Sequence, residues 1–241
     1  MSTAKPKPRA AFFFHLSLFS LLLVVAGFFL TFIKPSLQGR FKAPPIVYIH
    51  GMLALAWVLL LLAQTWLVRQ RRTLLHMRLG RIGMLLAIGI LITMVPMGQF
   101  QTQKDLAAGL GEFAYPVQLG TIISGLLFAS LVALGIYWRK RPATHKRLLI
   151  IATIVLLWPA WFRLRHYFPQ IPRPDIWLAY VAADSLILVC WLWDWLKNRQ
   201  IHLSWLFAGL FVIVEQGLEV FVYFNWPAFR AFSKDLYILL S

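Results

Sequence analysis

Seven long runs of apolar residues dominate this sequence and leave little choice of fold. They cover about residues 11–33, 46–68, 80–100, 116–138, 148–168, 175–196 and 203–224. Each run reaches the ~20 residues that an α-helix needs to cross the hydrocarbon of a bilayer. The runs are continuous rather than alternating, which argues against transmembrane β-strands. The sequence therefore predicts an all-α, polytopic transmembrane bundle of about seven helices.

The positive charge of the chain is placed where it can contact lipid headgroups. Of the 241 residues, 60% are hydrophobic and 13% are charged, and the formal net charge is +16. The basic residues occur in short clusters between the apolar runs, where they meet the phosphates of lipid headgroups. A nucleic-acid-binding protein would instead line one face with them. We therefore expect membrane lipid, and no nucleic acid, as the partner of this charge.

The basic clusters also predict an orientation. Most of the 24 lysines and arginines lie on the cytoplasmic side when the N-terminus is placed in the cytoplasm, as the positive-inside rule favours. This divides the chain into a basic cytoplasmic N-terminus (residues 1–10), a seven-helix membrane domain (11–224) and an outer tail (225–241). The tail is rich in aromatic and apolar residues, so we expect it to lie at the membrane interface outside the cell.

Two of the predicted cytoplasmic connections resemble each other. The stretch RQRRTLLHMRLGRIG enters the third span, and RKRPATHKRLLIIA enters the fifth. In both, a basic cluster precedes a histidine, with arginine two and leucine three positions later: His76, Arg78 and Leu79, and His145, Arg147 and Leu148. This pattern indicates either a duplication of one pair of spans, residues 46–100 and 116–168, or separate convergence of inner loops on basic residues.

These histidine boxes resemble those of a large group of uncharacterised bacterial polytopic inner-membrane proteins. The matching stretches lie within residues 46–210 and are HGMLALAWVLLLLAQTWLV, LLHMRLGRIG, THKRLLIIATIVLLWPAWFR and WDWLKNRQIHLSWLFAG. One departure is Met77, which stands where the group has an arginine directly after the histidine. The resemblance implies a helical membrane fold in the bacterial inner (cytoplasmic) membrane, and it implies no activity.

The predicted topology places four possible metal ligands on the cytoplasmic side: His76, His145, Asp194 and His202. Imidazole and carboxylate groups bind zinc, iron and manganese, so we expect a divalent transition metal there, with a redox or hydrolytic role. None of these histidines is paired at i, i+3 or i+4, so helix packing alone must bring them together. The alternative is that they cap helix ends or contact lipid phosphates.

A second set of residues lies toward the outer side. His50 and His166, with Arg163 and Arg165 for the propionates, form a possible site for haem b. Gln64 lies about 21 Å further inward than His50 on the same span, where it joins the cytoplasmic cluster or makes an interhelical hydrogen bond.

Three carboxylates lie within predicted spans: Asp184, Glu215 and Glu219. Ionisable groups at such depth pair with each other or line a water-filled cavity, so the sequence allows two hypotheses. In one, Arg163 and Arg165 form ion pairs with Glu215 and Glu219 that set the helix register. In the other, the carboxylates serve a proton- or ion-coupled transporter. A third hypothesis is a structural or assembly partner, either as a homo-oligomer or within a larger membrane complex.

Overall fold

The computed structural model describes the backbone of residues 8–241 and the side chains from residue 11 onward. Its α-helices are α1 (Pro8–Phe28), α2 (Lys34–Leu37), α3 (Pro45–Arg69), α4 (Thr73–Ala107), α5 (Pro116–Tyr137), α6 (Pro142–Arg163), α7 (Ala183–Asn198), α8 (Leu203–Phe221) and α9 (Pro227–Leu240). Two π-helical segments, Phe29–Ile33 and Asp175–Ala182, lead into α2 and α7. Short 3₁₀ turns lie at Gly111–Ala114, Trp138–Lys140, Leu164–His166 and Tyr223–Asn225.

The prediction of an all-α transmembrane bundle is confirmed. Seven helical segments within residues 11–225 are long and apolar enough to cross a membrane, and each overlaps one predicted window. Residues 8–241 contain no strand. The largest difference is α4, whose 35 residues extend well beyond the window 80–100 at both ends. Part of the predicted basic N-terminus, residues 1–7, lies outside the described residues.

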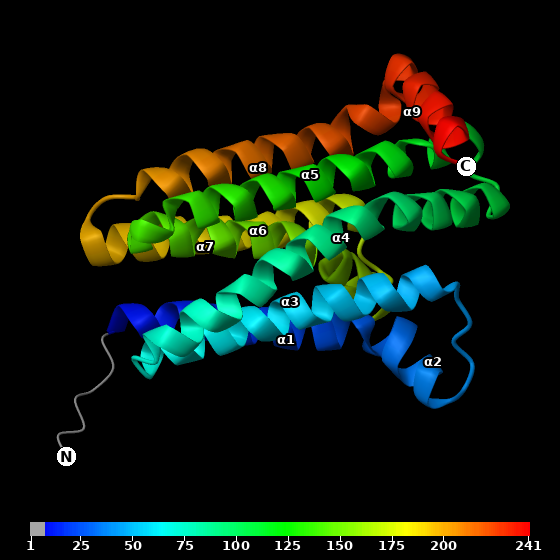
Figure 1. Cartoon of the computed structure of the whole chain (residues 1–241). Helices are drawn as coiled ribbons and strands as arrows, with labels where there is room; N and C mark the ends of the chain where they lie inside the picture. Colours follow the sequence, from blue (N-terminus) through cyan, green and yellow to red (C-terminus); the bar gives the residue numbers. More distant parts are fainter. Residues whose placement is uncertain (1–7) are drawn as a thin grey trace.

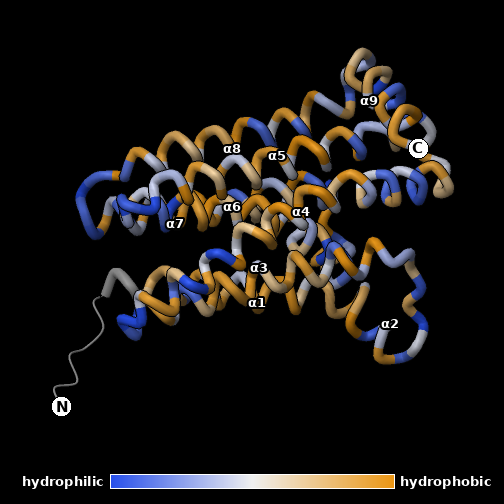
Figure 2. Tube along the Cα trace, in the orientation of Figure 1, coloured by the Kyte–Doolittle hydropathy of each residue, from blue (hydrophilic) through white to orange (hydrophobic). Residues whose placement is uncertain are grey.

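The seven spans run alternately between two sides of the bundle (Figure 1). We call the side where α1 begins the N side; it carries the connections α3–α4, α5–α6 and α7–α8. The opposite side, where α8 ends and α9 lies, is the C side. Figure 2 shows hydrophobic residues along most of the helices and hydrophilic ones gathered mainly at their ends and connections. Many large apolar side chains are exposed on the outside of the bundle, where they would contact lipid.

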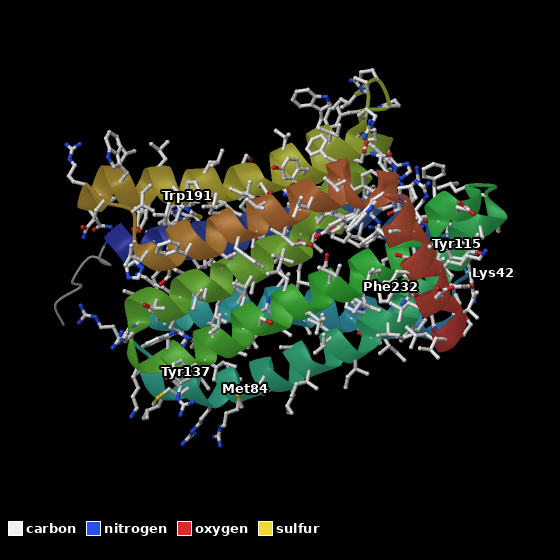
Figure 3. All side chains as sticks on the ribbon, turned by 90° about the horizontal axis from the view of Figure 1, so that it is seen from above. Lys42, Met84, Tyr115, Tyr137, Trp191 and Phe232 are labelled. Atoms are coloured by element: carbon white, nitrogen blue, oxygen red, sulfur yellow. The ribbon has the colours of Figure 1, made fainter. Side chains whose placement is uncertain are left out.

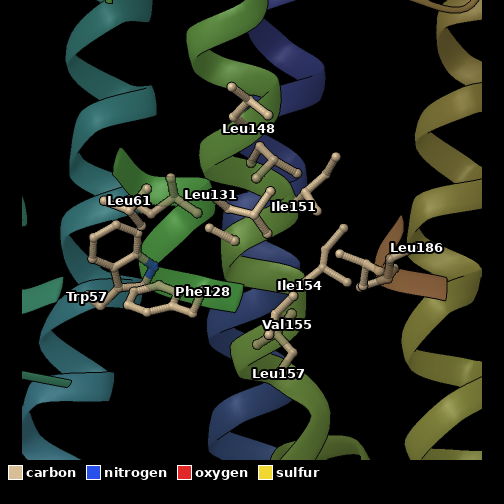
Figure 4. Close-up of a cluster of buried hydrophobic side chains, with 14 of the residues drawn as sticks. Trp57, Leu61, Phe128, Leu131, Leu148, Ile151, Ile154, Val155, Leu157 and Leu186 are labelled. Atoms are coloured by element: carbon tan, nitrogen blue, oxygen red, sulfur yellow. The ribbon is translucent and has the colours of Figure 1, made fainter. Parts of the chain in front are cut away.

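Helix α6 forms the centre of the bundle and packs against α1, α5, α7 and α8. Its apolar side chains, including Ile151, Ile154 and Leu157, are almost completely buried (Figure 4). On one side of it the ring of Trp57 on α3 meets Phe128 on α5 edge-on, with centroids 5.0 Å apart. The indole N–H of Trp57 donates to the hydroxyl of Thr153 on α6 at 3.1 Å, so α3, α5 and α6 are fixed to one another.

Gly27 allows α1 and α6 to approach closely. A Cβ atom at this position would clash with the carbonyl oxygen of Ala160 on α6, and small residues permit such close approach between membrane helices. We expect Gly27→Ala to lower the free energy of unfolding by about 1–3 kcal/mol, since backbone cannot move aside as a flexible side chain can. Gly51→Ala is the matched control, because nothing lies within 4 Å of its added Cβ.

The comparison is made by equilibrium unfolding in mixed micelles. Gly51→Ala should leave stability unchanged or raise it slightly, because alanine favours helix more than glycine does. Equal stability of the two alanine variants would contradict the close packing of α1 on α6.

The tail predicted at residues 225–241 is largely the helix α9, which lies across the C-side end of α5 (Figures 1 and 3). The rings of Tyr115 and Tyr237 lie 5.6 Å apart, and the guanidinium of Arg230 lies 4.8 Å from the Phe113 ring centre. The side-chain amide of Gln99 on α4 donates to the carbonyl of Leu240. The tail is therefore attached to the bundle, while its position at the membrane interface stays a prediction.

Candidate functional sites

A buried ion pair joins α6 to α7 at the N side. The Nε and Nη2 groups of Arg147 donate to Oδ2 and Oδ1 of Asp194, and Asp194 is 0% exposed. The side-chain amide of Asn198 donates to the same Oδ1 at 2.8 Å, and the backbone N–H of His202 donates to Oδ2 at 3.1 Å. Each oxygen of Asp194 thus accepts two hydrogen bonds, which compensates the burial of its charge.

His202 has a structural role at the start of α8. Its Nδ1 accepts a hydrogen bond from the backbone N–H of Ser204 at 3.2 Å, so the imidazole caps the helix. Burial, and then the positive charge of Arg147, lower the pKa of His202. The lower pKa keeps the ring neutral at pH 7 and preserves the lone pair that the cap needs.

The four predicted metal ligands do not form one centre. Among the residues that the structure describes, no group of three or more histidine, cysteine, aspartate or glutamate side chains is placed to hold a metal ion. Asp194 is bound by Arg147, and the Nδ1 of His202 is used by the helix cap. The sequence could not show that Asp194 pairs with an arginine 47 residues away.

The other two predicted ligands do come together. His76 and His145 are each the fourth residue of their helices, α4 and α6, and their ring centroids lie 6.4 Å apart with perpendicular planes. The Nδ1 of His145 lies 2.8 Å from the carbonyl oxygen of Gly135. The ring of His76 interacts with the backbone of Gln64, and its buried Nδ1 has no hydrogen-bond partner.

The residues predicted to bind haem lie in separate surroundings. The hydroxyl of Thr93 on α4 donates to the carbonyl of Gly89 at 2.7 Å and so accepts from Nδ1 of His50 at 2.8 Å. His166 is exposed and lies within electrostatic reach of Lys104. Thr93 and Lys104 are about 16 Å apart along α4. His50 and His166 therefore do not face each other as axial ligands of one haem would.

The two arginines of that prediction donate to carbonyl groups close to them in the sequence. Arg163 donates to the carbonyl of Pro159 at 3.0 Å and stacks on the ring of Phe28 at 4.2 Å. Arg165 donates to the carbonyl of Phe162, and its guanidinium lies over the ring of Phe162, 3.8 Å from the ring centre. Neither forms an ion pair with Glu215 or Glu219; in residues 11–241 the ion pairs are Arg147–Asp194 and Arg173–Asp175. The predicted register-setting ion pairs are thus wrong.

The buried carboxyl groups of α7 and α8 lack such partners. Asp184 is 5% exposed and Glu215 is 8% exposed, and none of their four carboxyl oxygens has a hydrogen-bond partner among the described residues. Glu215 lies within electrostatic reach of both Asp184 and Glu219. We call these three residues the carboxylate chain. Its first member, Asp184, lies two residues after the π-helical segment Asp175–Ala182, and π-helical turns occur frequently at functional sites.

Glycines make room for the groups around the carboxylate chain. A Cβ at Gly120 on α5 would lie 2.6 Å from Oε1 of Glu219, so this carboxyl group fills the space beside the α5 backbone. A Cβ at Gly217 would lie 3.0 Å from the hydroxyl of Tyr180, which interacts electrostatically with Asp184. Sequence reasoning missed Tyr180, although its spacing of four residues from Asp184 places both on one helix face.

Comparison with protein families, with characterised proteins and with solved structures finds no match to this chain. The function must therefore be argued from the residues themselves.

Proposed function

We propose that this multi-pass membrane protein is a proton-coupled transporter in which the carboxylate chain carries the protons. The observation that supports this most strongly is the burial of Asp184 and Glu215 with four unpartnered oxygens. A carboxylate inside a bilayer is expensive unless a cation, a proton or water compensates it. No arginine, lysine or histidine of residues 11–241 forms an ion pair with either group, so a mobile ion is the natural partner.

The spacing of the chain suits transfer in short steps. Glu215 and Glu219 are separated by about one turn of α8, or roughly 6 Å of rise. Tyr223, another turn toward the C side, lies within electrostatic reach of both. Tyr180 occupies the equivalent position next to Asp184 on α7. Each tyrosine hydroxyl thus lies on the C side of a carboxyl group, and the carboxyl groups continue toward the middle of the bundle.

The N side offers an opening at the other end of α7. A cavity of about 230 Å³ lies there, lined by Lys146, Arg147, Trp193, Asp194 and neighbouring residues. Asp184 and Asp194 are about 15 Å apart along the helix. We infer that protons cross this distance when the helices open during transport, and that the ion pair Arg147–Asp194 holds the N side closed at rest.

The test is proton flux into liposomes that contain the purified protein and a trapped pH-sensitive dye. A pH gradient should drive flux above that of protein-free liposomes. A hydrophobic carbodiimide, which modifies protonated carboxyl groups in apolar surroundings, should abolish it, with the modification mapped by mass spectrometry to Asp184, Glu215 or Glu219. Wild-type flux from protein modified at these residues would refute the proposal.

We also propose that the chain resides in a bacterial inner membrane with its N side in the cytoplasm. The support is the resemblance of the histidine boxes and the basic residues in the connections at the N side. Cysteines introduced at Arg139 and at Lys234 would report the orientation, since a membrane-impermeant thiol reagent added to intact cells should label only the second.

A further inference from the structure

We propose that His76 and His145 bind one divalent transition-metal ion of the zinc type, with the side-chain oxygen of Gln64 as the third protein ligand. The ion would bridge two helical hairpins, α3–α4 and α5–α6, at the N side. This inference does not depend on proton transport, because none of its residues belongs to the carboxylate chain.

The separation of the two rings is close to the separation that a shared ion requires. At metal–nitrogen distances of about 2.0–2.1 Å, the centre of each imidazole lies roughly 3.2 Å from the metal. Two rings on one ion are then at most about 6.4 Å apart, and about 5.2 Å apart in a tetrahedral site. The observed centroid distance is 6.4 Å. Side-chain rotations that bring the two ring centres about 1 Å closer together reach the tetrahedral geometry.

The hydrogen bonds leave each ring with one nitrogen for a metal. A carbonyl oxygen only accepts, so Nδ1 of His145 carries the proton toward Gly135 and Nε2 keeps its lone pair. In His76 the buried Nδ1 has no hydrogen-bond partner, so this nitrogen is available to a metal. Histidines that ligate metals characteristically donate their other ring N–H to such an acceptor.

His76 and Gln64, which lie side by side, both carry unsatisfied polar atoms. The Nδ1 of His76 and both side-chain atoms of Gln64 are buried without hydrogen-bond partners. Buried polar atoms rarely lack a hydrogen-bond partner, so each of these atoms is expected to bind a ligand or a water molecule. A metal ion would bind Nδ1 of His76 and Oε1 of Gln64 together, and water would complete the coordination.

The local sequence repeats around the two histidines. Arg72 and Arg141 directly precede α4 and α6, and their carbonyls accept from the backbone N–H of His76 and of His145, each at 3.0 Å. The repeated box thus places the two imidazoles at equivalent helix positions. The basic residues nearby disfavour a hard cation held by charge alone, whereas imidazole ligands select zinc, copper, nickel or iron.

The probe is Zn²⁺ alone, added to chelator-treated, tag-free protein in detergent and measured by calorimetry. We expect one Zn²⁺ per chain and a Zn²⁺-dependent rise in the unfolding temperature, because the ion joins two hairpins. His76→Ala and His145→Ala should lose both effects, and Gln64→Ala should weaken binding by roughly 10–100-fold. His166→Ala is the matched control and should bind as wild type does.

Wild-type protein that binds no Zn²⁺, or a folded double variant His76→Ala/His145→Ala that still binds it stoichiometrically, would overturn the proposal. Since the variants could fail to fold, the visible spectrum of Co²⁺-loaded wild type gives a second measurement. Bands typical of tetrahedral or five-coordinate nitrogen and oxygen ligation support the site, and an octahedral aqua-ion spectrum contradicts it. Proton flux is not a readout of this test, so the two proposals fail separately.

Discussion

Replacing Arg147 by methionine is expected to destabilise this protein more than any other single change at the N side. The substitution would leave Asp194, which is 0% exposed, with a buried charge and no cation. Breaking a buried ion pair in this way costs about 3–5 kcal/mol. Equilibrium unfolding in mixed micelles should show this loss, while Arg139→Met, which removes an exposed arginine from the same connection, should change stability by less than about 0.5 kcal/mol.

A double variant separates the charge from the packing. Arg147→Met/Asp194→Leu removes both partners, so no unpaired charge remains, and such replacements are often neutral. We expect it to recover most of the stability lost in Arg147→Met. A double variant as unstable as the single one would show that the hydrogen bonds from Asn198 and His202 to Asp194, rather than the ion pair, hold this side together.

Glu215→Leu is expected to stabilise the protein, in contrast to Arg147→Met, and to have the largest effect on proton flux. The unpartnered carboxyl group is costly where it stands, so a leucine should raise the free energy of unfolding by about 0.5–2 kcal/mol. Proton flux should fall about 100-fold or more, in line with the loss of a positioned proton-transfer group. Replacing a residue that only stabilises the fold would lower the free energy of unfolding and leave the proton flux unchanged. That result for Glu215→Leu would contradict a role of Glu215 in proton transfer.

The helices were predictable from the sequence because membrane spans follow from length and hydropathy alone. Each of the seven predicted windows overlaps a helix of the structure. The ends were less predictable: α4 continues to Ala107, since polar residues such as Gln101 and Asp105 satisfy each other along the helix. Hydropathy marks where a chain leaves the apolar layer, and it does not mark where the helix ends.

The sites were predictable only in part, because they depend on which helices meet. The repeated boxes singled out His76 and His145, which lie together. Asp194 and His202 share their side of the bundle, but pairing with Arg147 and capping of α8 occupy them. The same limit explains Arg163: its guanidinium finds an acceptor on its own helix and the ring of Phe28, so it does not cross to Glu215.

The proton flux of Glu215→Gln in liposomes tests the central claim most directly. Glutamine preserves the shape of the side chain and removes only its ability to bind and release a proton. With Asp235→Asn on α9 as the matched control, we predict that Glu215→Gln falls to the level of protein-free liposomes while the control retains wild-type flux. Wild-type flux from folded Glu215→Gln would contradict the proposal that the carboxylate chain carries protons through the bundle.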